Sequence, residues 1–170
     1  MRRGLYLGRF QPYHLGHHQV LKQIAKEVDE IIIGIGSAQK SHEIDNPFTA
    51  GERVLMVSSA LEEFNIKHYV IPIEDIQRNS LWVSHVNSMV PPYEIAYTNN
   101  PLVIELLSEA GIRVKQSPLF KRNSHSGTEI RGRMLKGEKW EHFVPEKVVE
   151  IIREIDGVNR LKTIAQSDQE

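Results

Sequence analysis

The stretch Leu5–Val28 reads L-Y-L-G-R-F-Q-P-Y-H-L-G-H-H-Q-V-L-K-Q-I-A-K-E-V, and the fold that the sequence predicts begins here. The short apolar run at 5–7 ends at a glycine and predicts a first strand. A loop follows, and apolar residues then recur at helical spacing over 15–28. A strand, a loop and a helix in this order form the first half of a β-α-β unit, which builds parallel sheets.

The same alternation continues along the chain. Further strands are expected at 30–35, 68–73, 94–97 and 112–115. Further helices are expected at 49–64, 80–89, 101–110, 127–135 and 146–155. The run Ile31–Ile33 is continuous and β-branched, which is typical of a strand buried on both faces. We therefore predict a single α/β domain over 1–170, with a doubly wound, mostly parallel, Rossmann-like sheet and a C-terminal helical part at about 137–170.

Local signals predict several helix ends. Thr49 and Glu52 form a T-x-x-E capping box at the start of the helix expected at 49–64. Gly111 is expected to end the helix at 101–110. Asp156-Gly157 is expected to end the helix at 146–155, with a short helix or a frayed tail after Arg160.

Composition excludes several classes of function. The 170 residues carry a formal net charge of -1, so no overall field attracts nucleic acid or an anionic membrane. The chain has no cysteine, which excludes disulfides, thiolate zinc sites and a cysteine nucleophile. Neither a signal peptide nor a membrane-spanning run is recognisable, so we expect a cytoplasmic protein that binds neither nucleic acid nor membrane.

The loop after the first strand carries a candidate phosphate site. It lacks both G-x-G-x-x-G and the Walker P-loop, but His14 and His17 lie three apart where a helix begins. Gly16 removes a side chain between them, the helix end offers N–H groups, and Arg9 adds a positive charge. The alternative is that the histidines cap the helix or ligate a metal. His18 is expected to be a solvated helix residue.

A second candidate follows the fifth strand, at Ser126–Arg131. Ligands of doubly wound sheets bind at the carboxyl ends of the strands, so both loops belong at the same edge. Ser126 and Glu129 also form an S-x-x-E capping box, and capping is the alternative role of Ser126.

These stretches resemble the signatures of the nucleotidyltransferase superfamily. His14-Leu15-Gly16-His17 matches H-x-G-H, and Ser126–Arg131 matches I-S-x-T-x-I-R, with His125 replacing the leading isoleucine. Three further stretches are similar to the archaeal nicotinamide-nucleotide adenylyltransferases, and the likeness covers nearly the whole chain: Gly36–Ser41, Asn46–Arg53 and Gly137–Trp140. Where Ser-Gly-Asn-Pro is expected, the chain has Thr98-Asn99-Asn100-Pro101, and asparagine tolerates the left-handed conformation that a glycine would supply, so the loop can be kept.

The resemblance implies adenylyl transfer from ATP to nicotinamide mononucleotide (NMN), which gives NAD and pyrophosphate. The acceptor phosphate is largely dianionic at neutral pH, so it attacks the α-phosphorus in line without a general base. On this basis His14 and His17 hold the α- and β-phosphates, Ser126 and Thr128 offer hydroxyls, and Arg131 stabilises the leaving pyrophosphate. Mg²⁺ is expected to bind mainly through the ATP phosphates, and no metal residue is assigned.

The acceptor pocket is expected at Asn79 and Trp82. Trp82 can stack on the cationic nicotinamide ring, and Asn79 can read the carboxamide; the alternative is that Trp82 packs in the core. Tyr97 and Phe120 are expected in the core. Three basic residues are interpreted as solvated charges: Lys121, Arg122 and Arg133.

Two alternatives remain open. One is a related transferase that uses pantetheine, riboflavin or glycerol phosphate, and Asn79 and Trp82 argue against it. The other is a non-catalytic nucleotide sensor, which the presence of His17 and Arg131 argues against. The resemblance also implies a ring-like homo-oligomer such as a hexamer.

Overall fold

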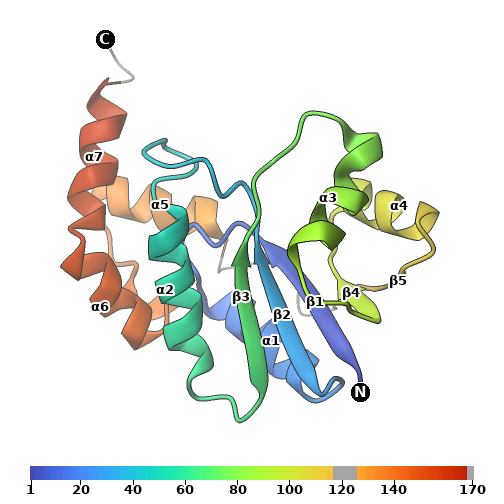
Figure 1. Ribbon diagram of the computed structural model, residues 1–170. Coiled ribbons are helices and arrows are strands. Elements are labelled where there is room, and N and C mark those ends of the chain that lie inside the picture. The colour runs from blue at the N-terminus through green and yellow to red at the C-terminus, as the bar shows by residue number, and fades with distance from the viewer. Residues whose placement is uncertain (117–125, 168–170) are drawn as a thin grey trace.

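Five strands form one sheet, in the order β3-β2-β1-β4-β5 (Figure 1). The structure is a computed structural model that describes residues 1–116 and 126–167. The strands are β1 (Arg3–Gly8), β2 (Glu30–Ile35), β3 (Lys67–Pro72), β4 (Ile95–Tyr97) and β5 (Arg113–Lys115). Every neighbouring pair is parallel. The chain winds from β1 out to β3 and then returns to β4 beside β1, so the predicted doubly wound parallel sheet is confirmed.

The predicted helices are also present, with shifts of a few residues at their ends. The α-helices are α1 (Leu15–Ala25), α2 (Ala50–Leu61), α3 (Trp82–Met89), α4 (Pro101–Glu109), α5 (Gly127–Lys136), α6 (Glu146–Glu154) and α7 (Gly157–Ser167). Two short 3₁₀ helices are η1 (Asn79–Leu81) and η2 (Glu141–Phe143). The helix predicted at 80–89 is therefore a 3₁₀ turn that continues into α3.

Alternate residues of the central strands enter two cores on opposite faces of the sheet. Tyr6 and Ile31 pack in the larger core, with residues of α1, α2, α5, α6 and α7. Leu5 and Ile32 pack in the smaller core, with residues of α3 and α4. Figure 1 shows the same division, with α3 and α4 on one side of the sheet and the C-terminal helices on the other. Burial on both faces explains the unbroken isoleucine run of β2.

The capping box that was predicted before α2 is confirmed. Thr49 Oγ1 accepts from the N–H of Glu52 at 3.1 Å, and Glu52 Oε1 accepts from the N–H of Thr49 at 2.8 Å. The capping box predicted at Ser126 is only half formed. Ser126 Oγ caps α5, but the Glu129 carboxylate pairs instead with Arg133, one helical turn later, at 3.1 Å.

The predicted end of the helix before Asp156-Gly157 is confirmed, because α6 ends at Glu154. At the end of α6 the left-handed residue is Asp156, with φ 53°, whereas Gly157 already begins α7. Position 157 favours glycine because of close packing and not because of its backbone angles: a Cβ there would come within 2.8 Å of the Phe48 ring. Asn99 is absent from the described non-glycine residues with positive φ, and the next residue, Asn100, accepts from the N–H groups that begin α4.

Candidate active site

Two histidines build the N-terminus of α1 at the carboxyl end of β1. His14 is the N-cap residue, and its Nδ1 accepts from the N–H of Gly16 at 3.0 Å and of His17 at 3.4 Å. In return, His17 Nδ1 accepts from the N–H of His14 at 3.2 Å. The imidazoles thus form a reciprocal capping box. The N–H groups of Gly16 and His17 were expected to be free for phosphate, but they donate to His14 instead. Capping and phosphate binding use different nitrogens of each ring.

These bonds fix the tautomer of each ring. A backbone N–H can only donate, so Nδ1 of both His14 and His17 must be unprotonated, and the ring proton lies on Nε2. The two rings are stacked, with centroids 3.7 Å apart. His17 also lies against Phe10, at 4.6 Å between centroids, and Tyr13, at 5.6 Å. This burial, together with the neighbouring His14, holds the pKa of His17 well below its usual range. His17 is therefore a neutral hydrogen-bond donor.

Arg131 reaches the same place from α5. Its side chain is buried, and Nη1 donates to the carbonyl of Gln11 at 2.8 Å, while Nη2 lies 3.4 Å from Thr128 Oγ1. Burial lowers the pKa of Arg131, and the positive charge of Arg9 adds to this effect. Gly127 is required for this reach, because a Cβ there would lie 2.6 Å from Nη1 of Arg131.

The two ends meet around one polar pocket of about 150 Å³. Five predicted site residues line it: Arg9, His14, His17, Thr128 and Arg131. Gly16 and Ser126 are not among the lining residues and serve as backbone donor and helix cap. Two helix N-termini, two imidazole donors and two guanidinium groups thus converge, as a polyanion site requires.

Several residues that the sequence did not single out hold this pocket in shape. The buried side chain of Gln11 bonds the backbone of Phe48 in both directions, at 3.1 and 2.9 Å. Buried Asn46 accepts from Arg9 at 3.3 Å. Gln11 lies in the segment Leu5–Val28 and Asn46 in the segment Asn46–Arg53. Nothing in the spacing of either residue indicated which side chain or backbone group it would contact.

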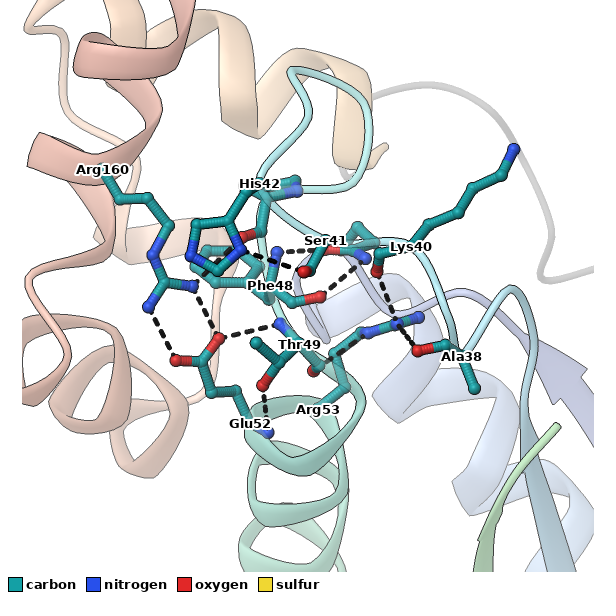
Figure 2. Close-up of polar contacts among 11 residues, drawn as sticks. Ala38, Lys40, Ser41, His42, Phe48, Thr49, Glu52, Arg53 and Arg160 are labelled. Atoms are coloured by element: carbon teal, nitrogen blue, oxygen red, sulfur yellow. Dashed lines mark hydrogen bonds and ion pairs between the residues drawn. The ribbon is translucent and has the colours of Figure 1, made fainter. Parts of the chain in front are cut away.

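Arg53 is the largest fully buried side chain, and it ties the loops after β1 and β2 together (Figure 2). Its guanidinium donates to the carbonyls of Arg9 at 3.0 Å and Gly36 at 2.9 Å, and to those of Ser37 and Lys40 at 3.1 and 3.2 Å. Burial lowers the pKa of Arg53 to about 10, so it stays charged at neutral pH. Backbone dipoles rather than a bonded carboxylate compensate this charge.

The expectation that His18 is solvated was wrong. Its side chain is buried beneath Phe64, Nδ1 lies 2.7 Å from the hydroxyl of Tyr13, and Nε2 bonds the Glu63 carboxylate. The partner is 45 residues away, so only the packing of α1 beside the end of α2 reveals it. Burial lowers the pKa of His18.

The proposed acceptor residues lie elsewhere, where η1 passes into α3. Asn79 is exposed, whereas Trp82 is half-buried and packs against the smaller core. Residues i and i+3 of a 3₁₀ turn lie one above the other, so both side chains share a face. Part of the Trp82 indole thus packs inward, as the alternative interpretation expected, and part remains accessible. Neither residue lines the polar pocket at Arg9, His14, His17 and Arg131.

The remaining predictions have mixed outcomes. Tyr97 is buried, as expected. Arg133 is held on the surface by Glu129, by the carbonyl of Lys139 and by the ring of Phe143, so it is not simply solvated. Phe120, Lys121, Arg122 and His125 lie outside the described residues. Within 1–116 and 126–167 no group of three or more histidine, aspartate or glutamate side chains is arranged to hold a metal ion.

The fold is that of a nucleotidyltransferase. The sequence profile described as cytidylyltransferase-like matches residues 5–133, and the chain belongs to this family. Within it, the chain groups with proteins named nicotinamide-nucleotide adenylyltransferase. That from Methanosarcina barkeri (strain Fusaro / DSM 804) is 66% identical over 99% of this chain and 97% of the relative. That from Archaeoglobus fulgidus is 58% identical over 98% of this chain and 99% of the relative.

Solved structures support the fold. A bifunctional NMN adenylyltransferase/ADP ribose pyrophosphatase from Francisella tularensis, complexed with AMP and a manganese ion, matches with a TM-score of 0.77 at 19% identity. The match covers 95% of this chain and 52% of that protein, so this chain spans about half its length. Among the described helices, none is long and apolar enough to cross a membrane.

Proposed function

We propose that the chain transfers the adenylyl group of ATP to nicotinamide mononucleotide, giving NAD and pyrophosphate. One observation carries the proposal: His14, His17, Arg9 and Arg131 converge on one pocket between two helix N-termini, in a chain whose full-length relatives bear this activity in their name. The arrangement provides donors for phosphate oxygens and needs no nucleophile from the protein.

The reaction is a single displacement. An oxygen of the NMN phosphate attacks the α-phosphorus of ATP, the new P–O bond forms, and the bond to the β-phosphate bridging oxygen breaks as pyrophosphate leaves. The acceptor is already largely ionised at neutral pH, since its second pKa is about 6. Catalysis is then positioning of two polyanions and stabilisation of the charge that develops between them.

Each pocket residue has a role in this proposal. His14 and His17 donate from Nε2 to α- and β-phosphate oxygens, and their fixed tautomers mean that no proton must move first. Arg131 stabilises the leaving pyrophosphate, and Thr128 and Ser126 lie at the end of α5 where the β- and γ-phosphates would approach. Arg9 contacts the γ-phosphate or the acceptor. The low pKa of His17 favours a neutral donor over a third cation beside Arg9 and Arg131.

The acceptor and the metal belong to the same proposal. Trp82 stacks on the nicotinamide ring and Asn79 reads its carboxamide, at the carboxyl side of β3. Mg²⁺ would bind mainly through the ATP phosphates and would neutralise part of their charge. We also propose a cytoplasmic location. We further propose a homo-oligomer such as a hexamer, and light scattering on the purified chain would measure its mass.

The test is product identification. The purified chain is mixed with ATP and Mg²⁺ and with either NMN or nicotinic acid mononucleotide, and products are separated by chromatography and mass. NAD and pyrophosphate in equal amounts are expected from NMN. Pantetheine phosphate and riboflavin phosphate serve as rival acceptors. Folded protein that makes no NAD, or that prefers a rival acceptor, would overturn the assignment.

A further inference from the structure

The C-terminal helix α7 contacts the segment that shapes the phosphate pocket, although α7 lies beyond the part of the chain that the family profile covers. Arg160, on α7, donates from Nη1 to the carbonyl of Pro47 at 3.1 Å. The same guanidinium forms a bidentate ion pair with the Glu52 carboxylate, with Nη1–Oε1 at 2.6 Å and Nη2–Oε2 at 2.8 Å. Figure 2 shows Arg160 reaching from α7 to Glu52 at the N-terminal end of α2.

A second contact joins α7 to the same segment. Gly157 begins the helix so close to the Phe48 ring that a Cβ would lie 2.8 Å from it. Pro47 and Phe48 are therefore held by a guanidinium on one side and by close backbone packing on the other. The Arg160–Glu52 pair is also well shielded, with side chains 19% and 18% exposed, and it lowers the pKa of Glu52 to about 2.

The segment Asn46–Phe48 in turn holds residues of the phosphate pocket. Asn46 accepts directly from Arg9. Phe48 bonds the side chain of Gln11 through both its N–H and its carbonyl, and the carbonyl of Gln11 receives Arg131. Hydrogen bonds, linked by the covalent backbone of Asn46–Phe48 and of Gln11, thus connect α7 with both guanidinium groups of the pocket.

We propose that Arg160 is a positioning residue for adenylyl transfer: through Pro47 and Glu52 it fixes the segment Asn46–Phe48, which sets Arg9 directly and Arg131 by way of Gln11. The inference rests on the proposed phosphate roles of Arg9 and Arg131. A bidentate arginine suits the task because its planar fork fixes direction as well as distance.

The test compares Arg160→Gln with a matched surface variant, Arg153→Gln, in steady-state assays with ATP and NMN. Arg153 lies on the neighbouring helix α6, and its side chain is 67% exposed. Its one ion-pair contact in the described residues is long, with Nη2 3.9 Å from Glu141 Oε1. Arg160→Gln is expected to raise KM for ATP and lower kcat, with a combined loss of about 10- to 100-fold, because small misplacements of positioning groups cost that much. KM for NMN should stay within about twofold, and Arg153→Gln should match the wild type.

Graded variants separate positioning from stability. Arg160→Lys keeps the charge but cannot hold Pro47 and both Glu52 oxygens in one geometry, so its kinetics should be intermediate. Gly157→Ala pushes on Phe48 without touching any charge and should change the same ratio of KM for ATP to KM for NMN. A merely structural Arg160 would lower the melting temperature yet leave kcat and both KM values unchanged well below it, and that result would overturn the inference. Failure of the proposed function is distinct, because the wild type itself would then make no NAD.

Discussion

The two ends of the proposed substrate site are built in contrasting ways. At the phosphate end, the backbone fixes the tautomers of His14 and His17, and Arg131 is buried with its guanidinium on a carbonyl. At the acceptor end, Asn79 is exposed, Trp82 is half-buried, and α3 begins without a side-chain cap. The phosphate end is organised before any ligand arrives, whereas the acceptor end offers mainly a surface.

The contrast follows from what each end must bind. Charge that develops in a transition state is stabilised best by donors that need not reorganise, and such donors need partners of their own. A flat aromatic cation needs little more than a ring of the right orientation. We therefore expect substitutions at the phosphate end to act on catalysis and those at the acceptor end to act on acceptor affinity.

The largest effect is expected for His17→Ala. Losing one pre-positioned donor should lower kcat by about 10²–10³-fold, the scale measured for an oxyanion contact. Stopped or steady-state assays with saturating ATP and NMN would measure it, with circular dichroism to check folding. An unchanged kcat would mean that His17 only caps α1, and the contrast between the two ends would disappear.

Gly127→Ala should have the next largest effect. Its Cβ would lie 2.6 Å from Arg131 Nη1, so the guanidinium must leave Gln11, and kcat/KM for ATP should fall about 10- to 100-fold. Gly132→Ala, on the same helix, is the matched control, because a Cβ there meets nothing within 4 Å. The control should keep full activity and gain about 0.5–1 kcal/mol of stability from better helix propensity. Equal kinetics in the two variants would contradict the placement of Arg131.

Two histidines of α1, His17 and His18, predict a pH-dependent stability. The pKa values of His17 and His18 are lowered in the folded chain, so the unfolded chain binds more protons below pH about 6.5. The free energy of unfolding should therefore fall as pH drops below that value, by up to about 1.4 kcal/mol per pH unit for each histidine. Urea unfolding at pH 7.5, 6.5 and 5.5 would measure the slope.

His17→Gln serves as the comparison for that slope. Glutamine keeps an acceptor for the N–H of His14 but cannot gain the proton, so the variant should lose part of the pH dependence. Identical slopes in the wild type and the variant would show that His17 takes up its proton as readily in the fold as in the unfolded chain.

The smallest effect is expected at the acceptor end. Trp82→Ala should raise KM for NMN about 2- to 5-fold, since a partly exposed cation–π contact contributes about 0.5–1 kcal/mol. KM for ATP should not change, and Trp82→Phe, which keeps a ring, should recover most of the loss. Equal changes in both KM values would indicate that Trp82 acts only through the smaller core.

Local sequence patterns were sufficient for the fold and for the expectation that the two motifs lie at one edge of the sheet. The alternation of β-branched runs with helical spacing predicted every strand, because burial on both faces of a parallel sheet leaves an unbroken apolar run such as Ile31–Ile33. The rule that parallel strands end at one edge of the sheet then predicted that the loop with His14 and His17 lies close to Ser126–Arg131.

Local patterns failed where a side chain meets a partner far along the chain. His18 looks like any polar residue of a surface helix, yet it is buried against Glu63, 45 residues away. Asn99 stands where the resemblance led us to expect a glycine, yet it has no positive φ, and its neighbour Asn100 caps α4.

The sequence by itself determined the order of strands and helices, the residues that can bind phosphate, and the absence of a cysteine nucleophile. Only the tertiary structure decided how those residues are held: Gln11 on Phe48, Arg53 under two loops, and Arg160 on Pro47 and Glu52. The physical reason is that periodicity and capping are local in sequence. A hydrogen bond from a side chain to a distant carbonyl depends on packing that brings the two segments together, and it leaves no repeating trace in either one.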